Sequence, residues 1–288
     1  MANLLSLKRR IRAAGNVSKT TRAMQMIAVS KLKKAQDATL SGRPYVEKLS
    51  SIAKSVSDKI ENKYIHAYIK KADNAENQKT LVLVFAPDKG LCGGLVTTLA
   101  REVIEVDKQN KNNIYLIVGR KIEATMGSLN KELVASFKFG TTLPSFESVS
   151  PIIKIINEYF LGKKVTSVKI LSTGFTSVFS QKPKITTILP IEFPREEPNS
   201  AKFTLFEPNV TELLPPLLNH YLEMTIYQLL LEAFASEQGA RMVAMQNATD
   251  NALEIVQDLQ LEYNKGRQEK ITNEILDIGG AAFTFAYE

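Results

Sequence analysis

The fold is decided by one stretch of the sequence, Met242–Tyr263, which reads MVAMQNATDNALEIVQDLQLEY. Its small and apolar residues recur at alternating steps of three and four positions, at Met242, Met245, Thr249, Ala252, Val256, Leu259 and Tyr263. So narrow a seam is typical of a coiled-coil helix rather than of a helix buried on all sides. The surrounding segment, 217–278, has only Gly239 and Gly266 as weak points. We therefore expect one helix of about 60 residues, roughly 90 Å long at 1.5 Å per residue.

The first segment of the chain, 2–58, shows a similar pattern and contains no proline before Pro44. Its stripe follows the three-four step at Leu4, Leu7, Ile11, Ala14 and Ser18, and again at Met24, Ala28, Leu32 and Ala35. A heptad helix at each end of one chain predicts an antiparallel pair. We expect its coiled-coil core to include Met24, Ala28, Leu32, Met242, Met245, Thr249, Ala252 and Val256.

Charge is distributed unevenly between the two ends. Residues 1–40 hold nine basic residues and one acidic residue, a net charge of +8, whereas 217–288 hold four basic and eleven acidic residues, a net charge of −7. Opposite charges favour pairing of the ends modestly, because exposed ion pairs contribute little individually. The alternative, that each helix covers another surface and its charges are merely solvated, stays open at this point.

Between the end helices, strand patterns alternate with helical patterns. Expected strands lie at 80–86, 114–118, 133–137, 165–172 and 184–191, and expected helices at 95–107, 121–129 and 146–161. Strands separated by helices of about a dozen residues are typical of βαβ units, which build a mostly parallel sheet. The polar stretches 70–79 and 193–202 are expected to be loops. The sequence thus predicts an α/β protein with a helix at each end.

Composition excludes several classes of protein. Of 288 residues, 44% are hydrophobic and 23% are charged, which is typical of a globular protein. A single cysteine excludes an intrachain disulfide framework. Basic residues from Lys8 onward interrupt the N-terminus before any apolar stretch, which disfavours a signal peptide, and no apolar run reaches the roughly 18 residues of a membrane span. We therefore do not expect a secreted or membrane-spanning protein.

The strongest candidate for a ligand site is the glycine turn 88–94, DKGLCGG, between an expected strand and an expected helix. Backbone amides in such a turn can bind a phosphate. However, a P-loop ends in Gly-Lys-Ser/Thr, whereas Gly94 is followed by Leu95, and the dinucleotide spacing is also absent. The sequence therefore favours a tight structural turn and leaves a nucleotide-binding α/β protein as an alternative.

Cys92 lies in this turn at an expected helix N-terminus, a position that would lower a thiol pKa. A catalytic cysteine also needs a base, and His66 and His220, the two histidines of the sequence, are far away along the chain. One cysteine and two histidines also make a transition-metal site improbable. We expect no catalytic residue, no bound cofactor and no metal site.

The basic N-terminal helix raises the question of nucleic acid. Residues 1–40 contain no aromatic side chain that could stack on bases. The basic residues also share their helix with a seam that needs a protein partner. A basic surface that faces solvent or protein is therefore favoured, and a basic nucleic-acid-binding coiled-coil protein stays as a second alternative.

Three segments resemble one known family, the gamma subunit of bacterial F-type ATP synthases, the central rotor shaft. The first runs from Ile11 to Leu32 and contains KTTRAMQMIAVSKL; the second is the turn 88–94. The third begins with SEQGARMVAM at Ser236 and continues to Ala281. The resemblance spans the chain. The sequence departs from the family pattern in an ending that is one residue shorter, in its tail residues Phe283, Phe285 and Tyr287, and in having no second cysteine for a regulatory dithiol.

The resemblance implies a domain organisation and a function. It implies an N-terminal helix at 1–60 that pairs with a C-terminal helix at 209–288, with a Rossmann-like α/β domain at 75–195 inserted between them. The paired helices would turn inside the ring of alpha and beta subunits, and the inserted domain would contact the epsilon subunit and the membrane c-ring. The subunit would couple proton flow to ATP synthesis without catalysing it, at the cytoplasmic face of the plasma membrane, with no cofactor and no nucleic acid.

The resemblance also implies which residues contact the ring. Arg267 and Gln268 would hydrogen-bond a loop of one beta subunit and act as a catch, since arginine can bind a carboxylate through two hydrogen bonds. A weaker contact with the ring would come from the basic face of the first helix. That face consists of Lys19, Arg22, Lys31, Lys33 and Lys34.

Overall fold

The computed structural model describes residues 4–59, 66–69, 79–138, 140–177, 180–193, 207 and 209–285, and of 279–285 only the helical backbone. Most of the two expected loops, 70–79 and 193–202, therefore lies outside the described residues, as do Tyr287 and the side chains of Phe283 and Phe285. The chain divides into two compact units, 1–27 with 242–288 (unit 1) and 28–241 (unit 2). Each unit contains part of both end helices, so the unit boundaries fall inside these helices.

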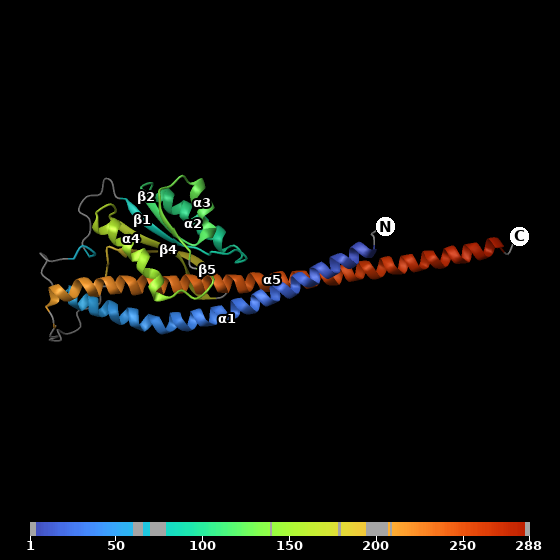
Figure 1. Cartoon of the computed structure of the whole chain (residues 1–288), viewed down its shortest axis with the longest axis horizontal. Coiled ribbons are helices and arrows are strands. Elements are labelled where there is room, and N and C mark those ends of the chain that lie inside the picture. The colour runs from blue at the N-terminus through green and yellow to red at the C-terminus, as the bar shows by residue number, and fades with distance from the viewer. Residues whose placement is uncertain are drawn as a thin grey trace. The chain divides into compact units, whose positions relative to one another are not determined.

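The two end helices are α1, Leu4–Ser57, and α5, Val210–Phe285 (Figure 1). The helical pattern predicts that the last helix starts near 217, whereas the family resemblance implies a start at 209, and proline ordinarily disfavours a helix interior. The helix instead begins at Val210 and includes Pro215 and Pro216. Burial of leucines at steps of four, Leu214, Leu218 and Leu222, offsets the lost backbone hydrogen bonds.

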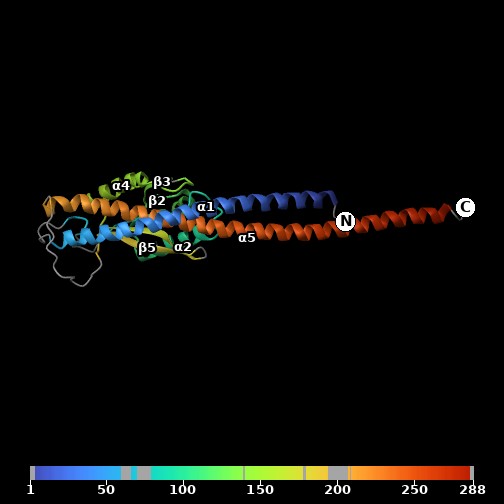
Figure 2. The ribbon, with the colours of Figure 1, turned by 90° about the horizontal axis from the view of Figure 1, so that it is seen from below.

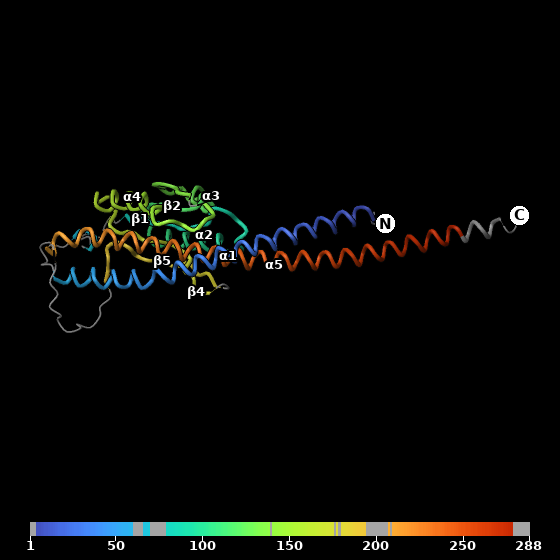
Figure 3. Tube along the Cα trace, turned by 60° about the horizontal axis from the view of Figure 1, so that its bottom comes forward, coloured from blue at the N-terminus to red at the C-terminus, as the bar shows by residue number. Residues whose placement is uncertain are grey.

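Unit 1 is an antiparallel helix pair. The Oγ1 atoms of Thr21 and Thr249 lie 2.7 Å apart, and a Cβ atom on Gly266 would lie 3.4 Å from Leu4 Cδ2. Moving toward the start of α1 thus means moving toward the end of α5, as the blue and red tubes show (Figure 3). Beyond Gly266, α5 continues past the start of α1.

The seam of unit 1 keeps the three-four step. In α5 the buried residues are Met245, Thr249, Ala252 and Leu259, while Met242 and Val256 are half-buried. In α1 the seam runs from the buried Ser18 through the half-buried Thr21 and Gln25. The sequence analysis placed Met24 in this core, but Met24 is 39% exposed. The step of three from Ser18 to Thr21 and of four to Gln25 leaves Met24 one position outside the seam.

In unit 2 the remaining parts of α1 and α5 also lie side by side and antiparallel (Figure 2). The Nε2 atom of Gln228 donates a 2.9 Å hydrogen bond to the Thr39 carbonyl, and Arg43 pairs with Glu232 at 3.0 Å. Ala28 and Leu32 are buried at this end of α1.

Unit 2 also contains a five-stranded sheet with the order β3-β2-β1-β4-β5. The strands are β1 (Thr80–Phe85), β2 (Asn113–Val118), β3 (Leu133–Phe137), β4 (Ser167–Ser177) and β5 (Ser180–Leu189). β1, β2, β3 and β4 pair in parallel, and β5 pairs antiparallel to β4. The predicted α/β class with a mostly parallel sheet is confirmed.

Both faces of the sheet are covered by helices. The helices are α2 (Leu95–Gln109), α3 (Glu123–Ser128) and α4 (Ser150–Leu161), with short 3-10 turns at Arg120–Ile122 and Phe146–Val149. Successive residues of β1 point to opposite faces: Leu81 and Leu83 pack in a core with α4 and with α5, whereas Val82 and Val84 pack in a core with α2. Because β1 is central and wholly buried, the turn that follows it is held firmly at its start.

Candidate functional site

The end of α5 in unit 1 exposes apolar side chains on one side. Their exposed fractions run from 42% to 72%, in Leu261, Ile271, Ile275, Leu276 and Ile278. At about 100° per residue, these side chains fall within roughly 160° of the helix circumference, opposite the coiled-coil seam. Exposed apolar side chains that share one sector of a helix can form a surface for a protein partner. We call these five residues the tip face.

Arg267 and Gln268, the expected catch residues, are both exposed in the same segment. Gln268 falls inside the sector of the tip face, and Arg267 lies at its border. The structure therefore brings the two residues to the face that the apolar side chains also use. The apolar residues of this face were not expected from the sequence, because Leu261 stands ten positions before Ile271 and the five residues follow no regular helical step.

The expected basic face of α1 is divided between the two units. Lys19 and Arg22 are exposed in unit 1, and Lys33 and Lys34 are exposed in unit 2. Lys31 differs from them, because it is half-buried and its Nζ donates a 2.5 Å hydrogen bond to the Thr141 carbonyl. Lys31 thus holds a loop of its own chain.

The first turns of α1 in unit 1 carry an open basic surface, formed by Leu5, Lys8, Arg9, Ile11 and Arg12. Leu5 is 57% exposed. The sequence signal for this surface is the alternation of apolar and cationic residues in these turns.

The glycine turn 88–94 lies between β1 and α2, and its backbone is held from the side of the sheet. The carboxylate of Asp88 accepts hydrogen bonds from the backbone amides of Arg120, at 3.1 Å, and Gly140, at 2.6 Å. Leu91 and Gly93 both have positive φ angles, 64° and 60°, a conformation that is uncommon for a residue such as leucine. Asp88 therefore joins three loops and fixes the start of the turn.

Arg241 holds the same turn from the side of α5. Its Nη2 atom lies 2.7 Å from Glu237 Oε1 and donates to the carbonyl oxygens of Lys89, at 3.2 Å, and Gly90, at 3.3 Å. Burial raises the pKa of Glu237, and the neighbouring Arg241 opposes that rise. The carboxylate and the guanidinium are thus both largely removed from water and satisfy each other.

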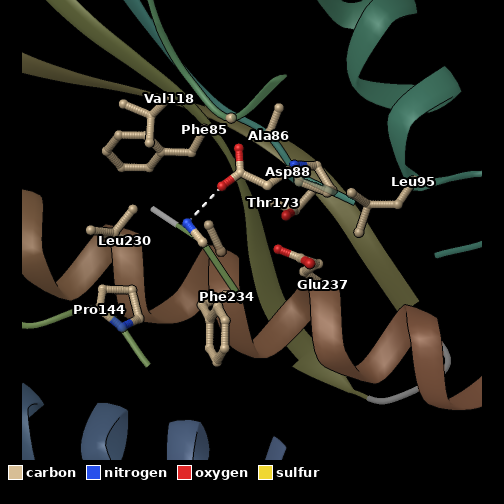
Figure 4. A pocket seen from close by; sticks show the side chains of 14 residues that line it. Phe85, Ala86, Asp88, Leu95, Val118, Pro144, Thr173, Leu230, Phe234 and Glu237 are labelled. Carbon is tan, nitrogen blue, oxygen red and sulfur yellow. Dashed lines mark hydrogen bonds between the residues drawn. The ribbon is translucent and has the colours of Figure 1, made fainter. Parts of the chain in front are cut away.

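A small cavity of about 30 Å³ lies between the turn and α5, and the carboxylates of Asp88 and Glu237 both face it (Figure 4). The cavity has the size of one or two water molecules. A phosphate would meet two carboxylates here, and the amides of Arg120 and Gly140 are already bound to Asp88. This geometry does not suit the nucleotide-binding alternative.

Cys92 is buried in the turn, and this burial raises the pKa of its thiol. The sequence analysis expected a lowered pKa from the helix N-terminus, but desolvation is the larger effect. His220 contacts Tyr45 and Phe146, and His66 contacts Tyr68. The thiol therefore lies in an environment that favours its neutral, unreactive form.

Metal ligands and membrane spans are considered for the described part of the chain. Within it, three or more His, Cys, Asp or Glu side chains nowhere gather in a way that could hold a metal ion. Within the same residues, a helix with the length and hydropathy of a membrane span is not found.

Comparison with known proteins identifies the family. A family model described as ATP synthase matches residues 3–284. The ATP synthase gamma chain of Dehalococcoides mccartyi is 38% identical, over 99% of this chain and 100% of that protein. The gamma chains of Methylacidiphilum infernorum and Legionella pneumophila are 37% and 31% identical, each over 98% of this chain and 99% of theirs.

Solved structures share the fold. A chain of the Euglena gracilis mitochondrial ATP synthase (OSCP/F1/c-ring, rotational state 3) has a TM-score of 0.70 at 18% identity, covering 98% of this chain and 94% of that one. A chain of the rotor of the same enzyme in rotational state 1 has a TM-score of 0.65 at 17% identity, covering 93% and 98%. With the sequence relatives, which match from end to end, these findings show that the chain belongs to the ATP synthase gamma chain family.

Proposed function

We propose that this chain is the central-stalk rotor subunit of a bacterial F-type ATP synthase, turned by proton flow through the membrane c-ring inside a ring of alpha and beta subunits. One observation carries the proposal: the tip face lies on the side of α5 opposite the seam. One side of α5 is buried against α1 in the coiled coil, and another side exposes apolar residues. Such a helix can contact a ring of other subunits that surrounds it. Family membership and the likeness to rotor chains support the same reading.

The mechanism is differential binding. The tip face covers only part of the helix circumference, so each orientation of the shaft presents different side chains to each beta subunit. Each orientation then stabilises a different conformation of each nucleotide site by its difference in binding free energy. The gamma chain itself forms and breaks no bond in this scheme.

We assign different partners to the paired helices and to the α/β domain. The paired helices, 1–60 and 209–288, contact alpha and beta subunits, while the α/β domain, 75–195, contacts the epsilon subunit and the c-ring at the cytoplasmic face of the membrane. The basic residues Lys19, Arg22, Lys33 and Lys34 are exposed and can meet acidic loops of the ring. Lys31 contributes less, because it already binds Thr141.

The assembly test uses the purified full chain. Mixing it with alpha and beta subunits from the same source should give a complex with ATPase activity, whereas the mixture without it should be nearly inactive. Equilibrium dialysis of the chain alone against ATP should show negligible binding. Tight ATP binding by the chain alone, with no activation of alpha and beta subunits, would refute the rotor assignment.

Arg267 and Gln268 are proposed as the catch on the beta subunit. In inverted membrane vesicles, Arg267→Ala combined with Gln268→Ala should lower coupled ATP synthesis at least about tenfold, the effect of losing roughly 1.4 kcal/mol. Assembly should change little, because both side chains are exposed. Glu262→Ala is the matched control, since Glu262 is exposed on the same helix but outside the sector of the tip face. Equal rates for the double variant and the control would remove the catch assignment.

A further inference from the structure

In unit 2, α5 contacts the sheet and the glycine turn through hydrogen bonds as well as through apolar side chains. Apolar burial holds α5 against the sheet through residues such as Leu218, Leu222 and Ile226. Such burial is non-directional, so it resists separation more than it resists rotation of a helix about its own axis. Hydrogen bonds are directional and can fix that rotation.

Two sets of directional contacts fix α5 near the end of unit 2. The buried hydroxyl of Ser236 donates a 3.0 Å hydrogen bond to the Thr173 carbonyl of β4. Arg241 donates to the carbonyls of Lys89 and Gly90 in the glycine turn. At about 100° per residue, positions 236 and 241 point roughly 140° apart around the helix. The helix is therefore gripped from two directions, one toward the sheet and one toward the turn.

The Glu237 carboxylate sets the orientation of this grip. Glu237 and Arg241 stand one helical turn apart, and their side chains are 11% and 14% exposed. Burying an ion pair is a weak source of stability, because desolvation offsets the attraction. A directional role fits the geometry better: the carboxylate holds the guanidinium Nη2 atom in the place from which the same atom also donates to the two carbonyls of the turn.

The turn itself is suited to transmit a force. Asp88 fastens it to the loops at Arg120 and Gly140, and the surrounding contacts must maintain the positive φ angle of Leu91, which leucine rarely adopts. We propose that Arg241, oriented by Glu237, clamps the glycine turn to α5, and that this clamp transmits the turning force between the sheet of unit 2 and the shaft helix. The clamp consists of Arg241, Glu237 and the carbonyls of Lys89 and Gly90. Its role in transmission rests on the proposed rotor function.

The first experiment measures the clamp in the isolated full chain. Arg241→Gln removes the charge and the forked donors, so hydrogen exchange of the amides in 88–94 should become at least about tenfold faster, while the amides of β2 keep their rates. Arg241→Lys, which keeps the charge but not the fork, should restore part of the protection. Arg43→Gln is the control, because it removes an ion pair between α1 and α5, Arg43–Glu232, in which the arginine is 45% exposed.

The second experiment measures transmission in the assembled complex. In inverted vesicles, Arg241→Gln should lower ATP-driven proton pumping severalfold relative to ATP hydrolysis, and Arg43→Gln should leave this ratio unchanged. Glu237→Gln should give a smaller decrease of the same kind, and it serves as the test variant if Arg241→Gln does not assemble.

Each outcome bears on the proposal. Faster exchange in the turn together with a lowered coupling ratio supports it. Unchanged exchange overturns the clamp, and a lowered coupling ratio with unchanged exchange would assign Arg241 to a partner subunit instead. Faster exchange with an unchanged coupling ratio overturns the role in transmission. If the wild-type chain fails to activate alpha and beta subunits, the rotor function fails, whereas the exchange experiment still decides whether the clamp exists.

Discussion

Gly42 should be a position where alanine, normally the better helix former, destabilises this protein. A Cβ atom at Gly42 would lie 2.6 Å from Gln228 Oε1, and Gln228 is buried with its Nε2 atom bound to the Thr39 carbonyl. Glycine here lets α1 and α5 approach closely. To admit the methyl group, either the helices separate or the Gln228 amide turns away from Thr39.

The effect of Gly42→Ala on stability depends on two opposing free energies. Replacing glycine by alanine inside a helix gains about 1 kcal/mol from propensity. Loss of the buried hydrogen bond costs about 1–3 kcal/mol, and the alternative, overpacking, costs a similar amount. Gly42→Ala should therefore lower the free energy of unfolding by up to about 2 kcal/mol.

The assay is urea unfolding of the isolated chain, compared at constant slope with two reference variants. Gly15→Ala should raise stability by about 0.5–1 kcal/mol, because a Cβ atom there would meet nothing within 4 Å. Gln228→Ala removes the obstructing amide, so combining it with Gly42→Ala should cost less than the sum of the single changes, by at least about 1 kcal/mol. A stabilised Gly42→Ala, or strict additivity in the double variant, would refute the steric argument.

Three further changes test other parts of the molecule. Gly119 has a φ of +108°, and a Cβ atom there would overlap the Ala86 carbonyl, so Gly119→Ala should cost more than about 3 kcal/mol by urea unfolding; near-wild-type stability would contradict this. Leu259 is buried in the seam, so Leu259→Ala should lower the free energy of unfolding by about 2–4 kcal/mol and speed hydrogen exchange in unit 1. Leu261 is 69% exposed, so Leu261→Ala should change that free energy by no more than about 0.5 kcal/mol. Equal effects of the two variants would argue against the seam. Burial raises the folded-state pKa of Glu237 above 4.5, so its contribution to stability is complete below pH 4.5 and is lost as pH rises through the raised pKa. Glu237→Gln should therefore weaken the dependence of the free energy of unfolding on pH. An unchanged dependence would exclude Glu237 as its source. The charged groups that act on Glu237 are Arg241, Asp88 and Lys31.

Most of the fold could be predicted because its signals are local and periodic. The strand at Leu133–Phe137 and the helix at Leu95–Gln109 were expected within two residues of their observed ends. The start of α5 could not be predicted from local signals, because burial of Leu214 and Leu218 outweighs the two prolines. Met24 was misplaced for a different reason. Its side chain is more apolar than Thr21 and Gln25, but the heptad register, which passes through those two, decides which positions face the partner helix.

Functional features could be predicted where they depend on position along a single helix, but not where they depend on contacts between elements remote in sequence. The exposure of Arg267 and Gln268 follows from their position along α5, whereas the five apolar residues of the tip face were not expected. The environment of Cys92 was not predictable, because its burial depends on packing against elements remote in sequence, and this burial reverses the expected direction of its pKa shift. The contact of Arg241 with Lys89 is likewise beyond sequence periodicity, since 152 positions separate the two residues.

Glu237 and Arg241 illustrate how a local signal acquires its meaning from the fold. Opposite charges four positions apart on a helix are usually an exposed pair worth a few tenths of a kcal/mol, as Lys270 and Glu274 are here. The pair Glu237–Arg241 has the same spacing but is buried, and its guanidinium also reaches the turn that follows the central strand. Arg241 is moreover the last residue of unit 2. The proposed clamp therefore joins the turn after β1 to the last residue of α5 that belongs to the unit containing the sheet.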